Sequence, residues 1–336
     1  MAKRIDEESV ISIPDAQGTV EIPQQTEFYK LPTRFGAVPV DEAPLGWEVE
    51  TRRHETKVTK FEHAYPRIYL PFQEVHKVEF GYADKFEPTE LFPKGANRLF
   101  FGDNLHIMRQ LPSKSIDLIY IDPPFFSGRN YNVIFGDKNE VRSFTDIWEG
   151  GMPGYLIWLN TRLYEMKRLL KDTGSIYVHL DWHASHYVKV EMDKIFGSGG
   201  ANGKQAGFKN EIVWCYSIGG KSNNTFGRKH DVILWYTKSN QWKFNGDDPR
   251  VRISRKPDSH MKTITDEDGN IWQEKTDKKT GKVYRYPLDK VPEDYWTDIE
   301  QLNREDAERV GYPTQKPGKL LARIISALSD EGGYCG

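Results

Sequence analysis

Apolar runs of strand length alternate with amphipathic runs of helical length through the middle of the chain. Residues 115–121 read Ser-Ile-Asp-Leu-Ile-Tyr-Ile, a mostly apolar run typical of a buried parallel strand. Residues 155–171 carry leucines and a methionine at helical spacing, and Thr173-Gly174 is expected to end that helix. A strand at 175–180 and a helix at 182–196 follow. Elements of these lengths in this order predict a parallel β-α-β architecture.

Weaker patterns lie on both sides of this centre. Residues 97–103 predict a strand with Asp103 at its C-terminal tip, and residues 104–111 predict a helix with Asn104 near its cap. A plain N-cap role for Asp103 is the alternative. Two β-rich runs, 211–216 and 231–236, could pair as a hairpin or lie in one sheet.

The end of the sequence predicts one more helix and the beginning of a strand. Residues 318–329 have an apolar face at helical spacing, and Pro317 stands near the start, where a missing N–H is tolerated. Gly332-Gly333 is then expected to turn the chain toward a strand that begins at Tyr334-Cys335.

The strand at 115–121 is followed by Asp122-Pro123-Pro124-Phe125, which ends it because proline cannot donate a ladder hydrogen bond. The Asp122 carboxylate, two backbone carbonyls and the Phe125 ring are thus expected at the edge where open α/β sheets bind ligands. These groups suit a planar base held by its exocyclic amine; a plain surface turn is the alternative. The long loop 126–154 beside them predicts a mobile cover over a substrate.

Composition narrows the class of protein. The 336 residues carry a net charge of −2, with a pI near 6.5 and a mean hydropathy of −0.68, so the chain as a whole is no polycation. It has no apolar run of membrane-spanning length and no signal sequence, which favours a cytoplasmic protein with no membrane contact. Cys215 and Cys335 form no disulfide framework or zinc motif. Neither follows a proline, which excludes the nucleophile of cytosine-C5 methyltransferases.

Charge is distributed unevenly along the chain. Residues 1–96 are polar and carry no motif, and they are expected to form an accessory extension. Residues 201–290 hold 18 Lys and Arg against 11 Asp and Glu, interleaved with aromatic residues. This pattern is typical of a surface that binds a phosphate backbone, although a solvated, loop-rich insert would look similar. The candidate DNA contacts within it are Lys278, Lys279 and Lys282. No metal site is expected, because His179 and His183 have no further ligand at a suitable spacing.

Four motifs together resemble the amino-methylating DNA methyltransferases, the adenine-N6 and cytosine-N4 enzymes with permuted motif order. They are Gly102-Asp103-Asn104-Leu105, Asp122-Pro123-Pro124-Phe125, the run from Ser175 to Asp181, and Thr314-Gln315-Lys316-Pro317. Their order and spacing cover residues 97–336. The resemblance is greatest to adenine-N6 enzymes of type II and type III restriction-modification systems, which favour Asp where this chain has Asp122.

The resemblance implies a Rossmann-like α/β fold that binds S-adenosylmethionine. It implies that Asp122, Pro123, Pro124 and Phe125 form the catalytic motif and that Asp103 approaches the adenine of the cofactor. It also implies that Thr314, Gln315, Lys316 and Pro317 help to wall the cofactor pocket. Residues 97–237 would form the catalytic core and residues 238–312 a target-recognition insert.

One feature departs from the family pattern. The glycine-rich cofactor loop should follow a few residues after Cys335, so residues 313–336 are expected to be the start of a cofactor-binding part that is truncated here, leaving the sheet incomplete. Such a fragment is expected to be inactive by itself.

The resemblance implies double-stranded DNA as the substrate, with methyl transfer to N6 of a flipped adenine. It allows for a restriction subunit as a partner and for a homodimer. Three other functions stay open: a cytosine-N4 methyltransferase, a non-catalytic DNA-binding relative, and a protein-glutamine or RNA methyltransferase. The last usually carries its cofactor loop before the Asp-Pro-Pro motif, and residues 1–96 contain no such signal.

Overall fold

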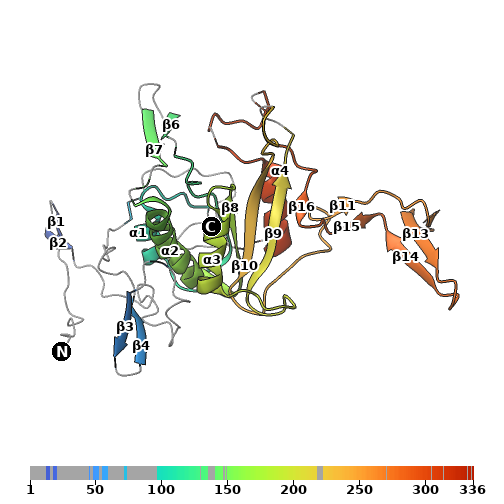
Figure 1. Ribbon diagram of the computed structural model, residues 1–336, viewed down its shortest axis with the longest axis horizontal. Helices are drawn as coiled ribbons and strands as arrows, with labels where there is room; N and C mark the ends of the chain where they lie inside the picture. Colours follow the sequence, from blue (N-terminus) through green and yellow to red (C-terminus); the bar gives the residue numbers. More distant parts are fainter. Residues whose placement is uncertain are drawn as a thin grey trace.

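The computed structural model describes most of residues 97–336 and a few segments before them (Figure 1). The residues after 97 that are left out are 129, 135–140, 147, 149, 218–221, 270, 304, 313, 331 and 334. The described residues before 97 are 13–15, 18–20, 45, 48–52, 55–59, 72 and 73. The expectation of an accessory extension at 1–96 therefore falls largely outside the described residues.

The main sheet has five strands in the order β16-β9-β10-β8-β5. Their bounds are β5 Ile116–Ile121, β8 Leu170–Leu180, β9 Gly207–Cys215, β10 His230–Thr237 and β16 Tyr295–Trp296. β5 and β8 are parallel, which confirms the predicted β-α-β unit. β10 runs antiparallel to both β8 and β9, so the two later β-rich runs both form a hairpin and join the sheet. The sheet is mixed, because β10 runs opposite to β5, β8, β9 and β16.

Helices cover both faces of this sheet (Figure 1). Their bounds are α1 Asn104–Gln110, α2 Gly151–Leu169, α3 Ser185–Phe196 and α4 Gly318–Leu328. Ile176, Val178 and Leu180 of β8 pack in one core cluster with residues of α2 and α3. Tyr177, between them, packs in the second cluster with residues of α4. This alternation follows from the two-residue period of a strand.

The boundary between α2 and β8 differs from the prediction. α2 begins at Gly151, since Pro153 is tolerated in the first turn of a helix, and β8 already begins at Leu170. Thr173-Gly174 therefore lies inside the strand and does not end the helix. A Cβ at Gly174 would lie 3.0 Å from Lys171 O and 3.1 Å from Asp117 O, so glycine allows this close approach of backbones.

The predicted strand at 97–103 is wrong. These residues belong to no strand, and the side chains of Leu99 and Phe101 are 98% and 84% exposed. The free edge of β5 is met instead by the chain end, where Gly336 N–H donates to Leu118 O and Tyr120 N–H donates to Gly336 O, both at 2.9 Å. Residues 97–103 consequently have no neighbouring strand in the described chain. An alternating apolar pattern forms a strand only where a second strand can accept and donate its backbone hydrogen bonds.

The remaining strands form small sheets outside the main one. They are β1 Ile13–Asp15 with β2 Gly18–Val20, β3 Glu48–Arg52 with β4 Glu55–Thr59, β6 Asn130–Ile134 with β7 Val141–Thr145, β11 Ile253–Ser254 with β15 Asp289–Lys290, and β12 Lys262–Thr265, β13 Ile271–Thr276 and β14 Val283–Pro287. The sheet of β12 to β14 projects away from the main sheet (Figure 1). Within the described chain, no helix has the length and apolar character needed to span a bilayer.

Two segments outside the β5-α2-β8 unit still contribute to the packing around it. Trp296 and Ile299 from the 238–312 region are buried in the core beneath α4. On the opposite side, Leu45 N–H donates to Glu191 Oε2 at 2.7 Å, and Asn160 Nδ2 donates to Leu45 O at 3.1 Å. Leu45 is thereby fastened to α2 and α3.

Candidate active site

The turn after β5 places a carboxylate and an aromatic ring at the carboxyl-terminal edge of the sheet. β5 ends at Ile121, and residues 122–127 continue outside any strand, as expected where two prolines follow. The side chain of Asp122 is 27% exposed, so a ligand can reach it. Asp122 and Phe125 therefore lie at the edge where the sequence predicts a binding crevice.

Lys316 reaches this turn from the segment before α4. Its Nζ lies 2.8 Å from Asp122 Oδ2 and 5.2 Å from the centre of the Phe125 ring. The structure thus joins two motifs that stand 194 positions apart. The resemblance assigns Lys316 to the cofactor wall, whereas the ammonium group here contacts the carboxylate of the motif expected to be catalytic.

Asp146 holds the far side of the turn, and no sequence pattern indicated it. Its side chain, 1% exposed, accepts hydrogen bonds from the backbone N–H groups of Phe126 and Ser127 at 3.0 and 2.5 Å and from Trp148 Nε1 at 2.9 Å. Phe126 has a φ of 62°, a left-handed conformation that costs a non-glycine residue roughly 1–3 kcal/mol. The bonds to Asp146 keep the chain in this strained conformation directly after Phe125.

Two further side chains fix the motif itself. The Tyr155 hydroxyl on α2 donates to Pro124 O at 2.8 Å, and burial raises the pKa of Tyr155, so the phenol keeps its proton. The Phe125 ring stacks on the His179 ring, with centres 5.9 Å apart and planes 26° apart. Asp122 and Phe125 are therefore displayed on a turn whose backbone and aromatic ring are held by named contacts.

Asp103 is oriented by a helix and by an arginine. Its Oδ1 accepts from Leu105 N at 2.8 Å as the N-cap of α1, which confirms the predicted cap. Arg162 Nη2 on α2 donates to both carboxylate oxygens at 3.0 Å. The Asp103 side chain remains 49% exposed, so Oδ2 can accept a further hydrogen bond from a ligand.

The segment 314–317 does not act as one unit. Gln315 is used within its own loop, because its Oε1 accepts from Val310 N at 2.9 Å and its Nε2 donates to Glu308 O at 2.7 Å. Pro317 is buried and is the N-cap residue of α4. Of these residues, Lys316 is the one that the structure brings to Asp122.

The lysines predicted to bind DNA lie apart from this turn. Lys278, Lys279 and Lys282 are exposed on the connection between β13 and β14, on the sheet that projects away from the core (Figure 1). Asp277 organises this connection, and hydrogen bonds from Thr280 and Lys279 lower the pKa of its carboxyl. DNA bound at the Asp122 turn would have to extend as far as this projecting sheet to contact these lysines.

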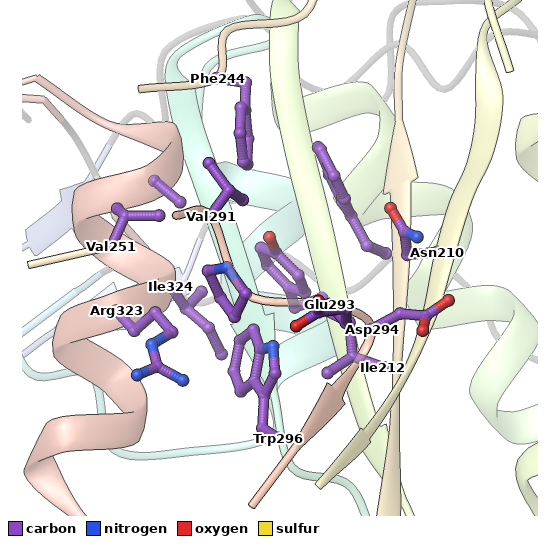
Figure 2. Close-up of a pocket in the computed structure, with 14 residues that line it drawn as sticks. Asn210, Ile212, Phe244, Val251, Val291, Glu293, Asp294, Trp296, Arg323 and Ile324 are labelled. Carbon is purple, nitrogen blue, oxygen red and sulfur yellow. The ribbon is translucent and has the colours of Figure 1, made fainter. Parts of the chain in front are cut away.

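Two cavities lie elsewhere against the main sheet. One, of about 90 Å³, separates the sheet from α4, and Figure 2 shows Arg323 and Ile324 of α4 beside Trp296 at its wall. The other, of about 240 Å³, has Asp117 and Lys171 in its lining. Neither cavity is lined by the residues around Asp122. In the parts of the chain that the structure describes, no group of three or more His, Cys, Asp or Glu could hold a metal ion.

Comparison with known proteins identifies the relatives of this chain. The profile of the N6/N4 methylase family, described as DNA methylase, matches residues 116–335. The DNA adenine methyltransferase YhdJ of Escherichia coli is 28% identical over 248 residues, covering 73% of this chain and 71% of YhdJ. The type II methyltransferase M.BglII of Bacillus subtilis is 27% identical over 249 residues, covering 71% and 58%. The Mod subunit of the Salmonella typhimurium type III restriction-modification enzyme StyLTI is 30% identical over 171 residues, covering 44% and 25%.

The matched region includes β5, the turn at Asp122, β8 and α4. The chain spans between 25% and 71% of the length of these relatives. The α/β fold, the Asp-Pro-Pro-Phe turn and the profile match over most of the chain lead to one conclusion. The chain belongs to the family of S-adenosylmethionine-dependent DNA methylases that modify exocyclic amino groups of bases, at N6 of adenine or N4 of cytosine.

Proposed function

We propose that this protein methylates N6 of adenine in double-stranded DNA. The observation that carries the proposal is the contact of Lys316 with Asp122 and Phe125: a nitrogen donor already lies beside the carboxylate and near the aromatic ring. An exocyclic amine requires the same two neighbours. The similarity to YhdJ, named as a DNA adenine methyltransferase, favours adenine over cytosine.

Asp122 acts on the amine by accepting a hydrogen bond from one of its two N–H groups. The N6 lone pair is delocalised into the purine ring, so the amine is a poor nucleophile until its geometry becomes tetrahedral. Lys316 contacts Asp122 Oδ2, which leaves Oδ1 as the acceptor for the amine. The hydrogen bond directs the lone pair toward the donated methyl group, and the rate gain comes from positioning and fixed charges.

Pro123 supplies the second acceptor. The carbonyl of Pro124 already accepts from the Tyr155 hydroxyl, so we assign the second N–H of the amine to the carbonyl of Pro123. With both N–H groups hydrogen-bonded, the lone pair of the nitrogen points in a single direction for attack on the methyl group. The proton lost from the methylated nitrogen passes to Asp122 or to water, and no covalent bond to the protein forms.

Phe125 stacks on the adenine after it leaves the duplex. A base inside a helix cannot reach the Asp122 carboxylate, so the enzyme must flip it out, and an aromatic ring compensates for part of the lost stacking. Phe125 rests on His179 and is therefore held at a fixed place for this contact.

S-adenosylmethionine supplies an electrophilic methyl group when bound. The described residues fit it in one respect: Asp103 Oδ2 is exposed and oriented by Arg162, so it can accept a hydrogen bond from the cofactor's adenine. Gln315 does not fit as freely, because both ends of its amide are engaged within the 308–315 loop. We assign Asp103 to cofactor binding and Thr314, Lys316 and Pro317 to the wall beside it.

The wider assignments rest on position and similarity. Residues 97–237 are proposed as the catalytic core, 313–336 as the start of the cofactor-binding part and 238–312 as the target-recognition region, with Lys278, Lys279 and Lys282 on the DNA backbone. A restriction subunit is a proposed partner, because StyLTI Mod is named as a subunit of a restriction-modification enzyme. A homodimer is proposed for the same assembly.

Product analysis tests the function. The full-length protein is incubated with duplex DNA and isotope-labelled S-adenosylmethionine, and the digested nucleosides are identified by mass spectrometry. We expect labelled N6-methyladenine from the parent and none from Asp122→Ala. Asp117→Asn is the matched control, because Asp117 is on the same strand and pairs with Lys171 instead. N4-methylcytosine would overturn the assigned base, and no labelled base would favour a non-catalytic relative.

A further inference from the structure

Four polar side chains cross the sheet beneath the turn at Asp122. Tyr120 Oη lies 2.6 Å from His179 Nδ1, and His179 Nε2 lies 3.1 Å from Asp231 Oδ2. The Tyr216 hydroxyl donates to Asp231 Oδ1 at 3.1 Å. These residues come from β5, β8, β10 and the end of β9, so one hydrogen-bonded row joins the four longest strands of the sheet.

A single arrangement of protons satisfies the whole row. His179 is 0% exposed, and burial lowers its pKa, so the ring is neutral. Burial also raises the pKa of Tyr120, which therefore donates its O–H to Nδ1. The imidazole proton is then on Nε2 and is donated to Asp231. Buried polar rows stabilise a unique geometry only when every member is paired, which this arrangement achieves.

The row also touches the catalytic turn at two points. Tyr120 stands two residues before Asp122 on the same chain, and the His179 ring carries the Phe125 ring at 5.9 Å. Trp214 packs edge-on against His179 at 5.5 Å, and its own Nε1 is fixed to Ile299 O at 2.7 Å. The imidazole therefore has its ring plane set by hydrogen bonds at both nitrogens and by a fixed neighbour.

We propose that His179 is a positioning residue for methyl transfer: its ring, held between Tyr120 and Asp231, sets the place and tilt of Phe125 and so the place of the flipped base. This inference rests on the function proposed above. A histidine that merely fills the core would not need partners on both nitrogens, since an apolar ring of similar size would pack there without desolvating a carboxylate.

Two matched tyrosine variants test the role. Tyr120→Phe removes the hydroxyl bonded to His179, while Tyr216→Phe removes a hydroxyl from the far end of the same row, which contacts Asp231 and not His179. We expect Tyr120→Phe to lower the single-turnover rate by roughly 10²-fold, the cost of a small misplacement of reacting groups, with DNA affinity unchanged. Tyr216→Phe should cost much less. His179→Phe keeps a ring beneath Phe125 but loses both hydrogen bonds, and it should be at least as slow as Tyr120→Phe.

Two further measurements separate positioning from stability. Ile233→Val alters a fully buried residue opposite His179 in the strand pairing and outside the row; it should lower the melting temperature and leave the rate unchanged. Nitrogen-15 NMR of labelled histidine should show His179 as the neutral ring with its proton on Nε2.

The outcomes are distinct. An imidazolium at His179, a proton on Nδ1, or a full rate for His179→Phe would overturn the inference. If the parent methylates cytosine, the base assigned above is wrong, and the same variants are compared on that product. If the parent methylates nothing, the proposed function fails and the role of His179 in transfer fails with it.

Discussion

The corner of the molecule around Asp122 and the basic region 201–290 use charge in opposite ways. At the corner, few charged groups are present, and each is fixed by partners from distant elements, as Asp122 is by Lys316 and Asp103 by Arg162. In the basic region, cations are numerous and exposed, and several are neutralised by nearby carboxylates. Arg252 lies 2.7 Å from Asp289 and Arg285 2.8 Å from Glu274. A count of lysines and arginines along a sequence therefore overstates the positive charge that a phosphate backbone meets, whereas a single carboxylate with fixed neighbours can determine a reaction.

The largest expected effect comes from the carboxylate at the corner. Asp122→Ala should lower single-turnover methylation by about 10²–10³-fold or more, because it removes the acceptor that orients the amine. Duplex affinity should change little, since phosphate contacts dominate it. Rapid-quench assays beside DNA-binding titrations measure both quantities. Near-normal methylation by this variant, judged against Asp117→Asn, would show that the corner does not perform the chemistry.

The next effect concerns the strained turn. Asp146→Asn replaces one acceptor oxygen with an N–H group facing backbone donors, so the turn at Phe126 should relax. We expect a loss of ~1–3 kcal/mol in unfolding free energy, the cost of unsatisfied buried groups, and a slower transfer step. Urea titration and single-turnover rates measure the two. Trp148→Phe removes only one of the donors to Asp146 and should lose less of both; equal losses in the two variants would argue against a special role for the backbone bonds.

Stacking by Phe125 should stabilise the flipped base by a free energy similar to, or smaller than, the one lost in Asp146→Asn. Phe125→Ala should lose ~1–3 kcal/mol of stabilisation of the flipped base, while Phe125→Tyr keeps an aromatic face and should keep activity. A 2-aminopurine at the target position reports flipping by its fluorescence. If the alanine variant gave the parent's fluorescence rise, Phe125 would have to be removed from the base-binding site.

The smallest effect on methylation is expected from the basic region. Variants there test whether DNA affinity depends on the number of cations or on which of them are already paired with carboxylates. Replacing Lys278, Lys279 and Lys282 with glutamate should weaken DNA binding. The slope of log K against log salt should also become shallower, by about 0.9 for each phosphate that the protein no longer neutralises. Arg250→Glu is the control, because Arg250 is already paired with Asp248. Its salt slope should stay near that of the parent. Identical slopes for all variants would mean that DNA does not contact the β13–β14 connection.

Local patterns were sufficient to predict the parts of the fold that depend on local order. The β5-α2-β8 unit and the end of α3 at Phe196 follow from apolar spacing, and the cap at Asp103 follows from a capping side chain. The strand at 97–103 was wrong, because a strand needs a neighbour and none of the described residues supplies one there.

The motif proposed as catalytic was recognised from its prolines and carboxylate, whereas the residues that hold it in place were not. Asp146 lies 20 positions from Phe126, and Lys316 lies 194 from Asp122. Separations of this size leave no periodic trace in a sequence, so such partners become visible only when the chain is folded. The partners of His179 are equally distant in sequence, since Tyr120 precedes it by 59 positions and Asp231 follows it by 52.

The reversed direction of β10 determines where the connections of the main sheet gather. Because β10 is antiparallel to β8 and to β9, the chain leaves β5, β8 and β9 at one common edge. The segments that follow these strands, 122–128, 181–184 and the described parts of 216–229, therefore gather at one side of the sheet. Of these, 181–184 and 222–229 hold no residue assigned to the reaction, so they can change in length without shifting the register of any strand. The sheet thus supports a fixed turn at Asp122 beside two neighbouring segments whose sequence can vary.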